Sequence, residues 1–305
     1  MNFSGVAASL ALLWSAALPS AAPADAAHPL LQFAREREQE RDAISHDAYY
    51  ASQLNRVEHE RDQARPPADE LCAGSMGAGR FAELHMNVGA AREGLGDIDG
   101  AIAAYRSAMA CRPRSLQSHL QLAKVLFGTR DANATRAVLE HALAIEPRNL
   151  EVNRRIANLE FVSGRWAEAM ARFRYVAASD PVPESAAFAQ LMFWMTQRRA
   201  GVREPEWVSR RIEDHWPRPL VLYSRSEYDE ADLVVHIRTH EDESWGDDVV
   251  DSQLASALFL VGEARLARGE PGLARQYLAA VVNIRLIHTD EYQLAMWEIA
   301  RLNQR

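Results

Sequence analysis

Lysine is almost absent from this 305-residue sequence: Lys124 is the only one, and arginine supplies the other positive charges. The formal net charge is −8, so the chain lacks the positive surface that binding to nucleic-acid phosphates requires. It also lacks a run of about 20 apolar residues, the length that a transmembrane helix needs. The sequence therefore argues against a nucleic-acid partner and against a transmembrane segment.

Motifs for catalysis are also missing. Residues 74–79 are rich in glycine, but no Gly-Lys-Ser/Thr follows them to cradle a phosphate, and there is no Gly-x-Ser-x-Gly nucleophile motif. His236 and His240 lie four residues apart and would share one helix face, as metal ligands do, and Glu241 and Asp242 follow them, but no motif places a further pair of ligands nearby. We therefore expect no enzyme, no metal site and no cofactor. The alternative is a metal-binding or enzymatic protein that uses the His236/His240 region.

Only two cysteines are present, Cys72 and Cys111. They could pair in an oxidising compartment, or they could be two unlinked thiols, and the sequence leaves both open. Neither lies just after the N-terminal apolar run, where a lipoprotein carries its lipidated cysteine. A lipid anchor is therefore not supported.

The N-terminus has the layout of a secretory signal peptide. An apolar run at residues 6–18 is followed by small residues, with A-x-A cleavage candidates ending at Ala24 and Ala26. We expect residues 1–26 to be removed on export, which places the mature protein in the periplasm. The alternatives are an unstructured or buried N-terminal segment, and a cytoplasmic adaptor whose N-terminus is not a signal.

A pattern with a period of 34 residues organises residues 82–181. Pro113, Pro147 and Pro181 are spaced 34 residues apart, which is the period of the tetratricopeptide (TPR) helix–turn–helix unit. When each proline is counted as position 32, three units begin at residues 82, 116 and 150. Spacing alone thus predicts three consecutive TPR units.

The residue types at the key positions agree with this register. Position 8, where the two helices of a unit touch, is small, and position 24, which plugs the next helix, is large and apolar. Position 8 holds Gly89, Ala123 and Ala157. Position 24 holds Tyr105, Leu139 and Phe173. Position 15, in the turn, prefers glycine because it can adopt φ > 0; Gly96 and Gly164 fit, whereas Arg130 does not.

The expected fold is an all-α TPR α-solenoid with a charged N-terminal helix and a C-terminal capping helix. After the signal peptide at 1–26, we expect the charged helix at 27–66 and a glycine-rich linker at 67–81. Three TPR units follow at 82–183, then a degenerate helical segment at 184–253 that contains an acidic loop at 241–251. A fourth TPR-like unit and the capping helix complete the chain at 254–305.

The charged segment at residues 31–63 contains neither Pro nor Gly, which favours one long helix. Its broken apolar stripe includes Tyr50, Leu54 and Val57 and predicts packing against the solenoid or a second copy of the chain. A solvated helix with little contact is the alternative. At the other end, Thr289 and Asp290 signal the start of the last helix, which we expect to close the open end of the solenoid.

Three short segments carry a resemblance to a known family: SALFLVG at 256–262, GEPGLA at 269–274 and EYQLA at 291–295. With three TPR units, a degenerate insert, one more unit and a last helix behind a signal peptide, the chain resembles the NlpI-type TPR proteins of Gram-negative envelopes. The resemblance implies an adaptor for cell-wall hydrolases and a periplasmic protease, and a homodimer. Members of that family carry an N-terminal lipidated cysteine, which this sequence lacks.

The first helix of each TPR unit lines the concave face of the array. Positions 5, 9 and 12 of these helices combine apolar groups with cations and an amide. Such a set suits a peptide, because rings bury apolar groups while cations and an amide hold the backbone or a carboxylate. The predicted protein-binding groove consists of Met86, Leu120, Lys124, Phe127, Arg154, Asn158 and Phe161. The alternative for Phe127 and Phe161 is packing at helix ends; the expected partners are proteins or peptides.

Overall fold

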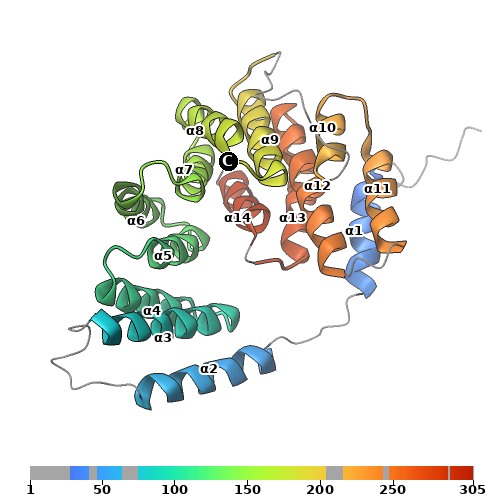
Figure 1. Cartoon of the computed structure of the whole chain (residues 1–305). Coiled ribbons are helices and arrows are strands. Elements are labelled where there is room, and N and C mark those ends of the chain that lie inside the picture. The colour runs from blue at the N-terminus through green and yellow to red at the C-terminus, as the bar shows by residue number, and fades with distance from the viewer. Residues whose placement is uncertain are drawn as a thin grey trace, which may run out of the picture.

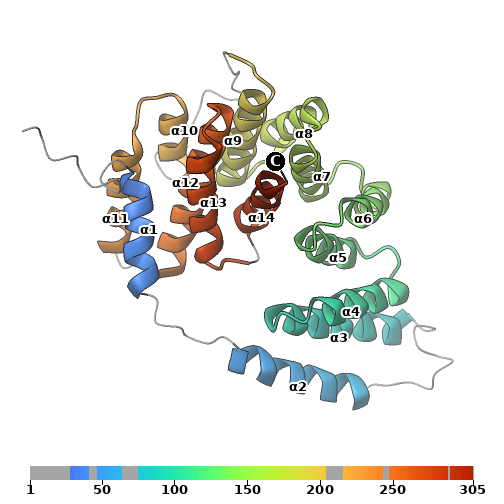
Figure 2. The ribbon, with the colours of Figure 1, turned by 180° about the vertical axis from the view of Figure 1, so that it is seen from behind.

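The computed structural model describes residues 28–40, 47–63, 75–203, 216–242, 247–287 and 289–304. Within these ranges the chain forms fourteen α-helices and no strand. Consecutive helices pack side by side in a curved array, so the chain is an all-α solenoid as predicted (Figures 1 and 2). The predicted signal peptide, Cys72 and most of the predicted glycine-rich linker lie outside the described residues.

The three predicted TPR units are three helix pairs. They are α3 (Ser75–Gly94) with α4 (Ile98–Cys111), α5 (Leu116–Gly128) with α6 (Ala132–Ile145), and α7 (Leu150–Val162) with α8 (Trp166–Ser179). Helices α5 and α7 begin at the first residue of the predicted units. Their starts are set by side-chain caps: Ser115 accepts a hydrogen bond from the backbone N–H of Ser118, and Asn149 accepts one from that of Val152. These two helix starts agree with the 34-residue register, whereas α3 begins before the predicted start of the first unit at residue 82.

The predicted contact positions form the interior of the array. Tyr105, Leu139 and Phe173 are buried. A Cβ atom added to Gly89 would lie 2.5 Å from the Tyr105 ring, so only glycine fits there. The tight approach of α3 and α4 therefore depends on this small residue.

The turns inside the units all use one left-handed residue. Gly96 has φ +76° and Gly164 has φ +72°, and Arg130 takes the same position in the middle unit with φ +63°. A side chain with a Cβ atom is strained in this region. The departure of Arg130 from the repeat pattern is thus accommodated by backbone strain, not by a different turn.

The charged N-terminal segment forms two helices where we predicted one. Helix α1 (Pro29–Glu40) packs on α11, α12 and α13, whereas α2 (Asp47–Gln63) packs on α3 at the far end of the array (Figure 1). Leu30 and Phe33 of α1 are buried, and Val57 of α2 is buried as well. Both helices therefore pack on the chain's own solenoid, and the alternative of a solvated helix is wrong.

Two predicted loops are shorter than expected. The predicted linker at 67–81 extends into α3, which begins at Ser75, so its last seven residues are helical. The predicted acidic loop at 241–251 also overlaps two helices, since α11 ends at Asp242 and α12 begins at Asp247.

The C-terminal half continues the array. Its helices are α9 (Pro183–Arg199), α10 (Arg218–Ser224), α11 (Glu230–Asp242), α12 (Asp247–Ala267), α13 (Pro271–Asn283) and α14 (Asp290–Asn303). The pair α12 and α13 contains the predicted fourth unit, with Gly269 at φ +79° in its turn, but α12 begins at Asp247, before the predicted start at residue 254. Residues 204–215 of the predicted degenerate segment lie outside the described residues.

The last helix packs on the last helix pair and lies on the inside of the curve of the array (Figure 2). As predicted, Thr289 caps α14, accepting a hydrogen bond from the backbone N–H of Tyr292. One face of α14 packs on α12 and α13, where Leu294 and Ala295 are fully buried. Its other face reaches α5 and α7 across the inside of the curve, which we did not predict (Figure 2).

Candidate functional site on the concave face

Met86 and Leu120 line the part of the concave face that α3 and α5 form. Both side chains are half-buried, and Ala90 beside them is exposed. Met86 packs against the core around Tyr105, and Leu120 packs against the core around Phe127. These two predicted groove residues therefore keep apolar surface open while their other side is fixed by packing.

The single lysine lies in an ion pair between α5 and α3. The Nζ atom of Lys124 is 2.8 Å from Oε1 of Glu93, and the Tyr105 hydroxyl donates to Oε2 of Glu93 at 3.2 Å. Burial raises the pKa of Tyr105 well above its ordinary value, and the negative charge of Glu93 adds to this, so the hydroxyl remains a donor. The pair holds the Lys124 ammonium in one place on the concave face.

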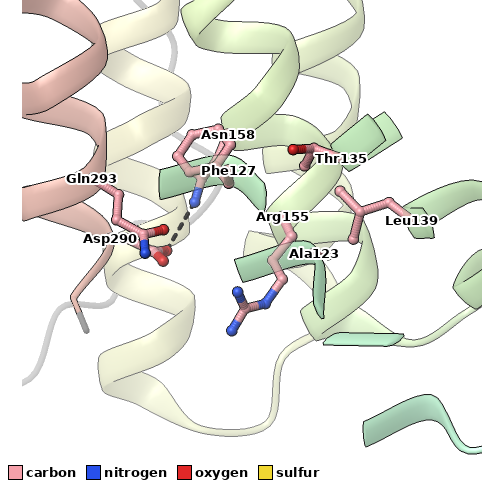
Figure 3. A pocket seen from close by; sticks show the side chains of 8 residues that line it. All are labelled: Ala123, Phe127, Thr135, Leu139, Arg155, Asn158, Asp290 and Gln293. Atoms are coloured by element: carbon pink, nitrogen blue, oxygen red, sulfur yellow. Dashed lines mark hydrogen bonds between the residues drawn. The ribbon is translucent and has the colours of Figure 1, made fainter. Parts of the chain in front are cut away.

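Arg154 and Asn158 of α7 bind a carboxylate, and the carboxylate belongs to the chain itself. Asn158 donates from Nδ2 to Oδ2 of Asp290 at 2.8 Å (Figure 3). Arg154 forms an ion pair with the same oxygen. Arg154 also contacts Glu151 at 2.6 Å, as does Arg155. Although burial opposes the ionisation of Glu151, these two guanidinium groups outweigh it and lower its pKa.

The two predicted aromatic anchors are covered by other side chains. The Phe127 ring lies 5.5 Å from the Trp297 ring, and the Trp297 indole N–H donates to the Phe127 carbonyl at 2.8 Å. Phe161 is fully buried between Trp166, at 5.5 Å in an edge arrangement, and the guanidinium of Arg199. This packing supports the alternative that Phe161 is a packing residue at a helix end. Phe127 is the residue of α5 on which Trp297 of α14 packs.

A small pocket lies where α14 meets α5, α6 and α7 (Figure 3). Its cavity volume is about 10 Å³, roughly the space of one water molecule, and it is lined by Ala123, Phe127, Thr135, Leu139, Arg155, Asn158, Asp290 and Gln293. Oδ1 of Asn158 is buried and has no hydrogen-bond partner. A buried acceptor without a partner is uncommon, so the contact of α14 with this face leaves one polar group unsatisfied.

The residues of the alternative metal site lie in helix α11. The His236 ring stacks on Trp216, with centroids 6.2 Å apart, and His240 is one turn further along the same helix. Among the residues that the structure describes, no three His, Cys, Asp or Glu side chains gather as metal ligands would.

Sequence reasoning missed Asp290, Gln293 and Trp297 as residues of the concave face. They lie at i, i+3 and i+7 of α14 and so share one face of that helix. That spacing is visible in the sequence, but it does not indicate which surface of the chain this face contacts.

Comparison with models of known protein families finds no match, and comparison with curated proteins finds none either. In the described part of the chain, no helix has both the length and the apolar character needed to cross a bilayer.

Cys111 is disulfide-bonded, and the only other cysteine of the sequence is Cys72.

Proposed function

We propose that this protein is a TPR scaffold that binds other proteins on its concave face. The observation that carries the proposal is the open surface of α3 and α5, where half-buried Met86 and Leu120 lie beside the fixed ammonium of Lys124. Apolar groups for burial next to an oriented charge are the elements by which helical repeats bind peptides. Helix α14 covers the α7 end of the concave face and reaches α5 at Lys124 and Phe127.

The compartment that we propose is the periplasm. The apolar run at residues 6–18 and the A-x-A sequences after it support export. The disulfide at Cys111 agrees with an oxidising compartment. N-terminal sequencing of the mature protein tests this: a start between residues 25 and 27 supports export, and an intact Met1 contradicts it.

The partners follow from the resemblance to the NlpI-type proteins. We propose cell-wall hydrolases and a periplasmic protease as partners, and a homodimer as the assembled form. Affinity capture from an envelope fraction, followed by mass spectrometry, tests the partner class. Recovery of a hydrolase or protease by the wild-type protein, and its loss with a Gln117→Arg variant on the exposed inner surface of α5, is the expected result. Equal recovery by both proteins would contradict the proposed surface.

A further inference from the structure

Helix α14 has two different faces. One face is part of the core, with Leu294 and Ala295 fully buried and Glu298 almost so. The other face carries Asp290 and Trp297, and it reaches α7 and α5. The helix is therefore fixed to the C-terminal half by apolar packing and touches the N-terminal half through a few specific contacts.

Each of these contacts is made with a residue of the predicted groove. Asp290 binds Arg154 and Asn158, Gln293 donates to the backbone carbonyl of Lys124 at 3.4 Å, and Trp297 lies on Phe127. Asp290 and Trp297 are seven residues apart, which is about 10 Å along a helix axis. The surface of α5 and α7 therefore has a site that binds a carboxylate and, at that distance, a site that binds an aromatic ring. The concave face of α5 and α7 thus binds an α-helix from its side.

The fit of α14 to this face is incomplete. The Asp290 and Arg154 side chains keep only 15% and 19% of their surface exposed, and the cost of removing such a largely buried ion pair from water offsets much of its attraction. Oδ1 of Asn158 has no hydrogen-bond partner, although it is buried at the contact. A helix that placed a donor at this point would satisfy the acceptor, which α14 does not.

We propose that the face of α5 and α7 is a receptor for a partner α-helix, with α14 as the chain's own weak occupant. The partner helix carries a carboxylate and, seven residues later, an aromatic ring. It gains access when α5 and α7 separate from α14, which stays with α12 and α13. This inference rests on the scaffold function proposed above and adds the class of partner and an autoinhibitory contact.

The test uses the α14 helix as the probe. A fluorescein-labelled peptide of residues 289–304 is titrated into the full chain, and fluorescence anisotropy reports binding. The double variant Asp290→Ala/Trp297→Ala, in which the internal helix has lost both contacts, is expected to bind the peptide at least tenfold more tightly than the wild type. The reason is that an internal competitor reduces the fraction of the chain that can bind.

Two matched controls tie binding to the proposed contacts. A peptide with alanine in place of Asp290 and Trp297 is expected not to bind the double variant. Adding Arg154→Ala to the double variant is expected to abolish binding of the natural peptide. Circular dichroism establishes that each variant is folded, and Asp290→Asn alone, which keeps the shape of the side chain, replaces the double variant if that one unfolds.

The outcomes separate this inference from the scaffold function. No binding to the folded variants, equal binding to the wild type and the variants, or binding that persists with Arg154→Ala would overturn the inference. None of these results affects the partner surface at Met86 and Leu120, because the capture experiment with Gln117→Arg tests that surface independently.

Discussion

The indole N–H of Trp297 donates a hydrogen bond to the backbone carbonyl of Phe127 at 2.8 Å, although the two residues lie 170 positions apart. This bond joins the last helix to the second TPR unit. Trp297→Phe keeps an aromatic ring and removes the donor, so we expect the free energy of unfolding to fall by about 0.5–1.5 kcal/mol. Urea denaturation measures the change; a variant as stable as the wild type would show that the bond contributes nothing.

Arg199 lies between two buried carboxylates, those of Glu263 and Glu298. Burial raises the pKa of Glu263, and Arg199 opposes this shift. Arg199→Met leaves the buried Glu263 carboxylate without its cation, whereas Glu298 keeps its ion pair with Arg301, and we expect the free energy of unfolding to fall by about 3–5 kcal/mol. The matched control is Arg165→Met, which removes an exposed ion pair with Glu168 and should leave the denaturation curve unchanged. Similar losses in both variants would refute this role of burial.

Arg130 adopts φ +63° where the other two units have glycine. Arg130→Gly removes the strain of a left-handed residue with a Cβ atom, which outweighs the added freedom of the unfolded chain. We expect the free energy of unfolding to rise by about 0.5–1 kcal/mol. Gly164→Ala, at φ +72° in the next unit, makes the reverse change and is expected to lower it by about 1 kcal/mol. Thermal melts of both variants measure the effect, and shifts in the same direction would contradict the account of these turns.

His85 of α3 has a pKa below its ordinary value, because burial and then the charge of Arg61 on α2 disfavour its protonation. The folded protein thus binds this proton less readily than the unfolded chain does. Stability should be constant above the ordinary pKa of about 6.5 and should fall as the pH is lowered towards the folded pKa. His85→Gln is expected to flatten this fall, while His141→Gln, at an exposed position, keeps it. A wild-type slope in His85→Gln would rule out His85 as the source.

The repeat part of the fold could be predicted from the sequence because each TPR unit is a local structure. Pro113, Pro147 and Pro181 set the period, and α5 and α7 begin where it predicts. The division of the charged segment into α1 and α2 could not be predicted, because no Pro or Gly marks a break between Glu40 and Asp47. Helix α1 packs on α11, α12 and α13, whereas α2 packs on α3. Contacts with such distant parts of the chain are not visible in the local sequence.

The candidate site was predictable only in part, for a related reason. The register placed Lys124, Arg154 and Asn158 on one face, but it did not place Asp290, the partner of Arg154 and Asn158, which lies 132 residues from Asn158. Such a contact depends on the curvature of the whole array, which is the sum of small rotations between units. The residue pattern and the spacing within one unit do not give these rotations, so they do not predict the contact between Asp290 and Asn158.

The central claim is that partners bind the concave face of α3 and α5. Ala90 is exposed on α3 at the position that Lys124 and Asn158 occupy in the next two units, so Ala90→Arg adds a long side chain to this face without removing an internal contact. Val235→Arg makes the same kind of change on α11, where Val235 is 66% exposed, and serves as the control.

Isothermal titration calorimetry of a partner recovered from the envelope fraction, against the wild type and both variants, tests this claim most directly. We predict that Ala90→Arg weakens the affinity at least tenfold, or about 1.4 kcal/mol, while Val235→Arg binds as the wild type does. Equal affinity of all three proteins would contradict the claim.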